Sequence, residues 1–319
     1  MTIENDLIKI DCEKEVNRIV SAMRDKVREF RRTGAIVGIS GGIDSSVSAA
    51  LSVRAFGAEK VIGIVMPEKE SSPDSMTLAV DLAKNLGISF VVEDITPILE
   101  SARVYEKRDS AIRDLIPQYS DEWTCKIVLS QDLLEKSRLN IFHVVVESPG
   151  GERISRRLPV KHYLEIVASS NYKQRSRMMT LYYHAERNNY AVIGTGNKNE
   201  CELGFYVKYG DGGVDIQPIS CFFKTQVFQL GKYLGIPSEI LTRTPTTDTY
   251  SAEVSQTDFF YKLDFDKLDT IWSALNKGIS IPEIASASQL SIKQVENIRD
   301  DIIQKTRSTE YIRANPVII

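Results

Sequence analysis

A short apolar run that ends in Ser-Gly-Gly constrains this chain more than any other stretch. Residues 35–39 are Ala-Ile-Val-Gly-Ile, which predicts a buried strand, and Ser40, Gly41 and Gly42 follow directly. A helical pattern begins at once and continues to about Phe56. Unpaired N–H groups at the start of a helix attract anions, and glycines let a phosphate approach the backbone. The stretch therefore predicts a phosphate-binding loop at the carboxyl end of a strand.

Polar side chains extend this loop. The hydroxyls of Ser40, Ser45 and Ser46 add hydrogen-bond donors. Asp44 places a carboxylate beside the expected phosphate, which is reasonable if a divalent cation such as Mg²⁺ lies between the two negative groups. The alternative is a plain tight turn in which Asp44 only suits the helix dipole. Gly-Lys-Ser/Thr is missing, so this is not a Walker loop. The stretch resembles the pyrophosphatase loop of enzymes that cleave ATP between the α- and β-phosphates.

Composition narrows the class of protein. The 319 residues carry a net charge of -3, which gives no bulk attraction to nucleic acid or membrane. The sequence has no run of about 18 apolar residues and no signal-peptide pattern at its start. Its four cysteines are scattered without a Cys-x-x-Cys, as is typical of a reducing compartment. We therefore expect a cytoplasmic protein with no nucleic-acid or membrane partner.

The first hundred residues predict an α/β fold. Apolar runs at 61–66 and 88–92 are typical of buried strands, and residues 75–86 between them have helical spacing. Residues 8–30 are also helical in pattern and are expected to cover one face of the sheet. Alternation of strand and helix predicts a doubly wound, Rossmann-like parallel sheet with helices on both faces. Ligands bind such sheets beyond the carboxyl ends of the strands, where Ser40 lies.

The region from 97 to 170 is the least regular. Residues 140–159, with Ser-Pro-Gly-Gly at their centre, predict an added β-hairpin, which could be a lid, an interface arm or surface elaboration. A helix is expected from Asn171 to Asn188 and a buried strand from Tyr190 to Ile193.

A second set of polar segments follows the strand at 190–193. It contains Gly-Thr-Gly-Asn-Lys-Asn-Glu at 194–200, Lys-Tyr-Gly-Asp-Gly-Gly-Val-Asp at 208–215, and Lys224 before a further helix. Carboxylates and lysines on loops between sheet elements favour binding over packing. Two polar strand ends facing each other would form a nucleotide cleft. Solvated faces, turns and caps are the alternatives.

Five segments in this order and spacing resemble the ammonia-dependent NAD⁺ synthetases. They are the loop 40–46, Asn171-x3-Arg175-x-Arg177-Met178, residues 194–200, residues 203–215 and Phe223-Lys224-Thr-Gln-Val. The likeness covers roughly residues 10–95 and 171–319. It implies one synthetase-like domain over 1–319 with an adenine nucleotide hydrolase-like fold, an insertion at about 97–170 and a C-terminal helical segment at about 265–310.

The resemblance implies a two-step reaction. The carboxylate of nicotinate adenine dinucleotide attacks the α-phosphate of ATP and pyrophosphate leaves. Ammonia then attacks the acyl-adenylate to give NAD⁺ and AMP. The ammonia would arrive free or from a separate glutaminase. The family's dinucleotide site lies at a two-fold interface, so a homodimer is also implied.

The resemblance also assigns site residues. Catalytic roles fall on Asp44, Asp211 and Lys224, and a Mg²⁺ site falls on Asp44 and Glu200. ATP would contact Ser40, Gly41, Gly42, Asp44, Ser45, Ser46, Thr195, Lys224 and Thr246. The dinucleotide would contact Asn171, Arg175, Lys208, Asp211 and Asp215. Asp44 lies at a loop end, so its replacement is expected to leave folding nearly unchanged.

Three departures from the family pattern leave the acceptor open. They are Thr247-Asp248-Thr249 after Pro245-Thr246, Asp258-Phe259 in place of Asp-Glu, and Tyr311-Ile312-Arg313 in place of His-Lys-Arg. The same chemistry on a different carboxylate is therefore an alternative. Basic residues of the hairpin would compensate if it closes over the site: Arg153, Arg156, Arg157 and Lys161. A second alternative is a nucleotide-sensing DNA-binding regulator, because residues 278–295 resemble a helix-turn-helix.

Overall fold

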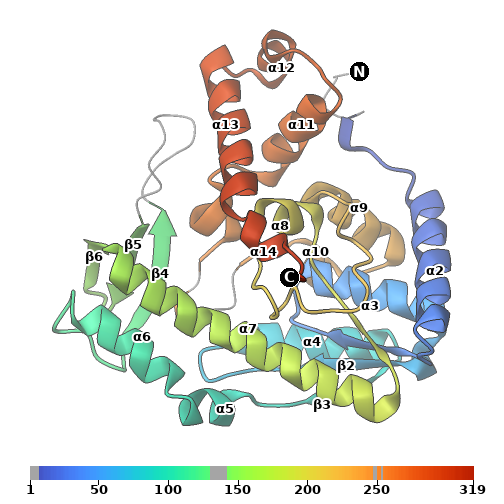
Figure 1. Cartoon of the computed structure of the whole chain (residues 1–319), viewed down its shortest axis with the longest axis horizontal. Helices are drawn as coiled ribbons and strands as arrows, with labels where there is room; N and C mark the ends of the chain where they lie inside the picture. The colour runs from blue at the N-terminus through green and yellow to red at the C-terminus, as the bar shows by residue number, and fades with distance from the viewer. Residues whose placement is uncertain (1–6, 130–141, 247–249, 253) are drawn as a thin grey trace.

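A four-stranded parallel sheet forms the centre of the molecule (Figure 1). The computed structural model describes residues 7–129, 142–246, 250–252 and 254–319. The strand order is β3-β2-β1-β7, so β1, which precedes the phosphate loop, is an inner strand. Ala35 pairs with Val61 on one side and with Ala191 on the other, which brings the carboxyl ends of these strands to one edge. The strands are β1 (Ala35–Gly38), β2 (Val61–Val65), β3 (Ser89–Val92) and β7 (Ala191–Ile193).

Helices cover both faces of this sheet, as the alternating pattern predicts. Val37 faces a core formed with α2, α3, α4 and α9, whereas Ile36 packs against Ala185 and Leu181 of α7. The first face is built by α2 (Cys12–Glu29), α3 (Ile43–Phe56), α4 (Pro73–Asn85) and α9 (Lys224–Leu234), and the second by α7 (Val160–Asn188). The α/β fold class is confirmed.

The central region has more structure than its sequence suggests. The predicted hairpin forms β5 (Phe142–Glu147) and β6 (Arg153–Arg157), and residues 140 and 141 lie outside the described part of the chain. An unexpected strand, β4 (Thr124–Leu129), pairs with β5 to complete an antiparallel sheet. Its buried face packs against the end of α6 (Val104–Arg113) and the start of α7. The preceding helix, α5 (Thr96–Ser101), packs through Leu99 in a separate small cluster with Val104 and Tyr105. The hairpin is therefore part of a packed sheet.

The helix expected from Asn171 begins eleven residues earlier, at Val160. Pro159 precedes its first turn, a position that suits proline because the first N–H groups of a helix have no partner within it. The 29-residue helix runs along the lower part of the view in Figure 1, from the antiparallel sheet to the edge of the parallel one.

The C-terminal helices form a bundle above the parallel sheet (Figure 1). The pair that resembles a helix-turn-helix is present as α12 and α13, and Ile284, Val295 and Ile298 pack in one core with Trp272 of α11. No helix in the described ranges is long and apolar enough to cross a membrane. The remaining helices are α8 (Lys198–Leu203), α10 (Ser238–Leu241), α11 (Phe265–Asn276), α12 (Ile281–Ser288), α13 (Ile292–Ser308) and α14 (Glu310–Arg313), with short turns at Ala58–Lys60 and Thr257–Tyr261.

Candidate functional site

The phosphate loop is held in shape by its own backbone and hydroxyls. Gly41 has a φ of 77°, and a Cβ there would lie 2.5 Å from the carbonyl oxygen of Ser75, so only glycine fits. The hydroxyls of Ser45 and Ser46 donate to the carbonyl oxygen of Gly42, at 3.0 and 2.8 Å. Gly42 directly precedes α3, so the loop lies at a helix N-terminus, as predicted.

Asp44 is the meeting point of three elements. It lies in the first turn of α3, and its carboxylate forms an ion pair with Lys224, the first residue of α9. Asn197, between β7 and α8, donates its Nδ2 to Asp44 Oδ1 at 3.0 Å. The Lys224 side chain is 1% exposed and that of Asp44 is 15% exposed, so the ion pair lies largely out of water. The two polar strand ends therefore meet, as the sequence predicts.

Glu200 completes this cluster from the first turn of α8. Asn197 and Glu200 form a capping box, in which each side chain accepts the other's backbone N–H at 3.1 Å. Burial and the neighbouring Asp44 carboxylate raise the pKa of Glu200 to about 8. The Asn-x-x-Glu spacing is a capping-box signal that sequence reasoning could have used to find Asn197.

The two carboxylates have the chemistry of a magnesium site. Hard carboxylate oxygens are the ligands that Mg²⁺ prefers, and a cation would relieve the repulsion that raises the Glu200 pKa. Within the described ranges, no group of three or more histidine, cysteine or acidic side chains could hold a metal alone. Mg²⁺ commonly takes one or two carboxylates and completes its shell with water and substrate phosphates. The residues present fit such a site.

A buried residue far away in the sequence holds Lys224 in place. Asp269 of α11 accepts hydrogen bonds from the N and Oγ1 atoms of Thr225, at 2.9 and 2.8 Å, and so caps α9. Its other oxygen accepts from Asn199 at 2.5 Å, while Asn199 Oδ1 accepts the Lys224 N–H. Burial raises the pKa of Asp269 to about 6, so the carboxylate is ionised at neutral pH. Nothing local in the sequence indicates this support.

We expect Asp269→Asn to destabilise the fold by about 2–4 kcal/mol, because an amide NH₂ would face donors that need an acceptor. The melting temperature should fall accordingly. Asp266→Asn, an exposed change on the same helix, is the matched control and should leave it within the error of the measurement. Equal melting curves for the two variants would contradict this prediction.

Residues expected near the dinucleotide gather around the chain's C-terminus. Arg175 of α7 donates from its Nε to the carbonyl oxygen of Lys208 at 3.3 Å. The Lys208 ammonium donates to the carbonyl oxygens of Tyr311 and Ala314, at 3.1 and 2.7 Å. Asp211 accepts the backbone N–H of the same loop's Val207, at 2.7 Å. The structure therefore joins the middle of α7, the glycine-rich loop and α14.

The other predicted residues are placed less directly. Asp215 accepts from Val192 N and Tyr182 Oη, at 2.8 and 3.0 Å, and so ties its loop to β7. Asn171 lies one turn before Arg175 on α7, and Thr195 follows β7 by two residues. Thr246 pairs with Ser255, whose neighbour Gln256 contacts Glu200. The departures at Thr247, Asp248 and Thr249 lie outside the described residues.

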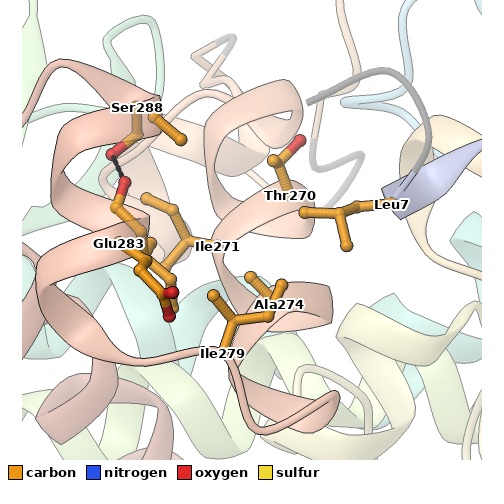
Figure 2. Close-up of a pocket in the computed structure, with 9 residues that line it drawn as sticks. Leu7, Thr270, Ile271, Ala274, Ile279, Glu283 and Ser288 are labelled. Carbon is orange, nitrogen blue, oxygen red and sulfur yellow. Dashed lines mark hydrogen bonds between the residues drawn. The ribbon is translucent and has the colours of Figure 1, made fainter. Parts of the chain in front are cut away.

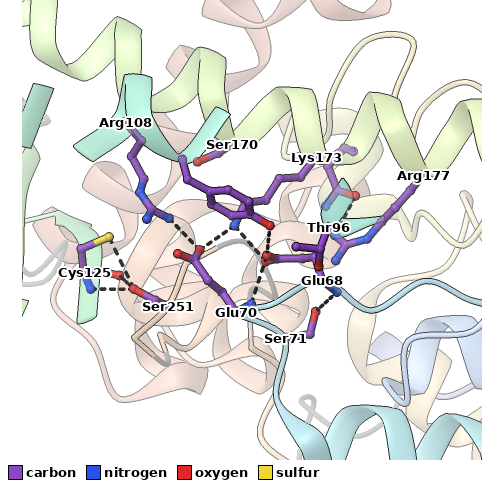
Figure 3. A network of polar contacts seen from close by, with 12 residues as sticks. Glu68, Glu70, Ser71, Thr96, Arg108, Cys125, Ser170, Lys173, Arg177 and Ser251 are labelled. Carbon is purple, nitrogen blue, oxygen red and sulfur yellow. Dashed lines mark hydrogen bonds and ion pairs between the residues drawn. The ribbon is translucent and has the colours of Figure 1, made fainter. Parts of the chain in front are cut away.

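A buried ionic network follows β2 (Figure 3). The Lys173 ammonium lies 2.9 Å from Glu68 and 2.7 Å from Glu70, and Arg108 lies 2.6 Å from Glu70. Burial opposes ionisation of Glu70, but the hydrogen bond from Arg108 and the charge of Lys173 lower its pKa to about 2. Glu70 and Arg108 also line a polar cavity of about 570 Å³. The network fixes the part of α7 from which Arg175 projects.

An apolar cavity of about 250 Å³ lies in the C-terminal bundle (Figure 2). Leu7, Ile271, Ala274 and Ile279 surround it, and Glu283 reaches its rim while capping α12. None of the predicted site residues lines it.

Comparison with known proteins identifies the family of this chain. The family model described as NAD synthase matches residues 15–118 and 145–316. The chain is 44% identical over 314 residues to the NH(3)-dependent NAD(+) synthetase of Rhizobium meliloti, covering 98% of this chain and 94% of that protein. It is 45% identical over 313 residues to the protein of the same name from Mesorhizobium japonicum, covering 98% of each. The solved NMN synthetase of Francisella tularensis has the same fold, with a TM-score of 0.66, 22% identity and coverage of 98% of this chain and 99% of that one.

Proposed function

The chain belongs to the NAD synthase family, and on that premise we propose that it binds and activates ATP at the cluster of Asp44, Lys224 and Glu200. It catalyses the ATP-dependent amidation of nicotinate adenine dinucleotide to NAD⁺. The proposal rests on one observation: the glycine loop, the buried Lys224 and the carboxylates of Asp44 and Glu200 lie together at one edge of the sheet.

The cluster suits the first half of the reaction. The dinucleotide carboxylate must displace pyrophosphate from the α-phosphate of ATP, so negative charge builds on the leaving group. Backbone N–H groups at the start of α3, the Ser40 hydroxyl and the Lys224 ammonium can neutralise that charge. Ser45 and Ser46 shape the loop for ATP, because their hydroxyls donate to the Gly42 carbonyl oxygen. Thr195 and Thr246 would contact ATP from the neighbouring loops. Ammonia then takes the acyl group and AMP leaves, with ammonia supplied free or by a separate glutaminase.

Mg²⁺ would be held by Asp44 and Glu200. When bound, the cation supplies charge neutralisation at the phosphates. The protein's own part is to orient the two carboxylates, and Asn197 does this for both by donating Nδ2 to Asp44 and its backbone N–H to Glu200. Lys224, whose ammonium pairs with Asp44, lies close enough to share the same phosphates.

The dinucleotide would lie over Asn171, Arg175 and the 208–215 loop. Arg175 is exposed on α7, and Lys208 joins that loop to the C-terminal residues. Asp211 and Asp215 contribute carboxylates from the same loop, although Asp215 also serves the fold through its two hydrogen bonds. The departure at 259 has a packing role, because Phe259 contacts Phe205 and Tyr250 with ring centroids 5.7 and 5.6 Å apart.

The outer face of α7 supports a homodimer. Large apolar side chains are exposed along it at Val160, Leu164, Tyr172, Met179 and Tyr183. At about 100° per residue these positions fall within an arc of about 140° on the helix, and Asn171 and Arg175 lie in the same arc. Exposed apolar side chains gathered on one face of a helix mark an interaction site. We infer that two copies pair along α7 and that the dinucleotide site adjoins the interface.

We also infer that residues 1–319 work as a single unit. The three largest apolar clusters among the described residues lie under one face of the parallel sheet, in the antiparallel sheet and in the C-terminal bundle. Asp44 adjoins the core under the parallel sheet, Gln256 adjoins the core of the antiparallel sheet, and Glu200 adjoins the core of the C-terminal bundle. The site therefore depends on all three cores.

The test of this function is pyrophosphate release from ATP. Release should require nicotinate adenine dinucleotide, and ammonium should then convert the adenylate to NAD⁺ with one AMP formed per NAD⁺. Nicotinate mononucleotide, which has the same carboxylate and lacks the adenylate half, serves as the comparison and should give little release. Faster release with the mononucleotide, or release without any acceptor, would contradict the assignment of the acceptor.

A further inference from the structure

Gln256 contacts the cluster from a part of the chain that the sequence left unassigned. Its Nε2 lies 3.3 Å from Glu200 Oε1, and its side chain is buried. The other Glu200 oxygen accepts the Asn197 N–H at 3.1 Å, so each oxygen of this carboxylate has one protein donor. Two donors on opposite oxygens fix the rotation of the carboxylate plane. The Gln256 Oε1 is buried with no hydrogen-bond partner among the described residues.

The backbone around Gln256 is tightly held. Its N–H donates to the carbonyl oxygen of Pro245 at 2.9 Å, and Ser255 forms an antiparallel bridge with Thr246. The Ser255 hydroxyl then accepts the N–H of Asp258 at 2.9 Å, which starts the turn Thr257–Tyr261. Gln256 therefore reaches Glu200 from a fixed position.

The antiparallel sheet contacts the residues just before Gln256 and holds them in place. Cys125 of β4 donates its N–H to the Ser251 hydroxyl at 2.8 Å (Figure 3). The carbonyl oxygen of Cys125 accepts the N–H of Ala252 at 3.1 Å. Tyr250 and Val254 are buried in the same core as Ile127 and Val144 of the sheet. These contacts hold the segment that leads to Gln256 against the antiparallel sheet.

We propose that Gln256 is a positioning residue for Glu200, and that the antiparallel sheet β4–β6 holds the segment before Gln256 in place. A carboxylate that must meet a cation and a substrate at a defined angle needs its rotation fixed by neighbouring donors, and losing such a donor commonly costs ten- to a hundred-fold in metal affinity or activity. The role rests on the proposed function of Glu200 as a cation ligand.

The direct test is Gln256→Leu, which keeps the side-chain volume and removes the donor. We expect the kcat for NAD⁺ formation and the affinity for Mn²⁺, measured by electron paramagnetic resonance with ATP present, to fall about ten- to a hundred-fold together. The melting temperature should change little, because the lost hydrogen bond to Glu200 is offset by the removal of a buried unpaired oxygen. Gln256→Glu keeps the shape and the oxygen without the donor, and should be at least as impaired.

Gln229→Leu is the matched control, because this amide also joins two segments, by hydrogen bonds to Ile8 and Ile10. It should lower the melting temperature and leave kcat and Mn²⁺ affinity unchanged. Ser251→Ala tests the role of the sheet, because it removes the hydroxyl that accepts the Cys125 N–H. It should lower kcat and Mn²⁺ affinity by the same factor, and Ser251→Thr should restore both.

Two results would overturn the proposal. Normal kcat and Mn²⁺ affinity in Gln256→Leu would remove the role of Gln256. A Ser251→Ala variant with a lower melting temperature but normal kcat and Mn²⁺ affinity would mean that the sheet supports folding alone. Failure of the proposed function is distinguishable, because the unmodified enzyme would then release no pyrophosphate with the dinucleotide.

Discussion

Replacing Asp44 by asparagine is expected to slow NAD⁺ formation by about 10²–10³, the loss typical of one preorganised electrostatic group. The same change should destabilise the folded protein. Lys224 is buried, and its ammonium would lose the carboxylate that pairs with it. An unpaired buried charge costs several kcal/mol, and we expect about 2–4 kcal/mol here because Asp44 is partly exposed. Activity and thermal melting are measured together.

This expectation corrects the one drawn from the sequence, which placed Asp44 on a loop end and predicted nearly unchanged folding. The sequence could not show that Lys224, 180 residues later, buries its ammonium against that carboxylate. A double variant separates the two effects. Asp44→Asn with Lys224→Met should recover most of the stability, because the unpaired charge is gone, and should remain as inactive as the single variant or more so.

Asp74→Asn is the matched control for Asp44→Asn, since Asp74 occupies the first turn of α4 as Asp44 does that of α3, but is exposed. It should change neither rate nor melting. An Asp44→Asn enzyme with a normal rate of ATP–pyrophosphate exchange would rule out the role of Asp44 in the first step.

Local signals explain what the sequence could predict. The strand, the glycine turn and the helix start around Ser40 are consecutive, and each has its own residue pattern, so both the loop and its position at the sheet edge were predictable. Asp269 and Gln256 were not, because each acts through a contact with a segment tens of residues away. Their residue types, an aspartate in a helix and a glutamine before a turn, are ordinary in solvated positions.

The early start of α7 was missed for a different reason. Residues 160–170 have apolar side chains on both sides of the helix: Ile166 is buried against the antiparallel sheet, while Val160 and Leu164 are exposed. Such a stretch lacks the single apolar stripe by which an amphipathic helix is identified. The exposed apolar side chains that obscure the helical pattern also indicate that the outer face of α7 packs against another surface.

The outer face of α7 is the proposed dimer interface, so we expect Met179→Glu to convert the protein from a dimer to a monomer, as measured by light scattering. Met179 is 51% exposed and belongs to the apolar stripe of α7. In a two-fold interface the charge enters twice, so we expect a loss of about 3 kcal/mol or more, a hundred-fold or greater rise in the dissociation constant. The KM for the dinucleotide should rise with it, because Arg175 lies in the same arc of the helix, while ATP binding is retained.

Met76→Glu, on α4 with 41% exposure, introduces the same charge outside the stripe and should leave a dimer with unchanged KM. A Met179→Glu protein that is still dimeric would place the interface elsewhere. A monomer with an unchanged KM would mean that one chain completes the dinucleotide site alone. A monomer that binds ATP normally and has lost dinucleotide binding is the expected result, because the face of α7 that pairs two copies would then also shape the acceptor site.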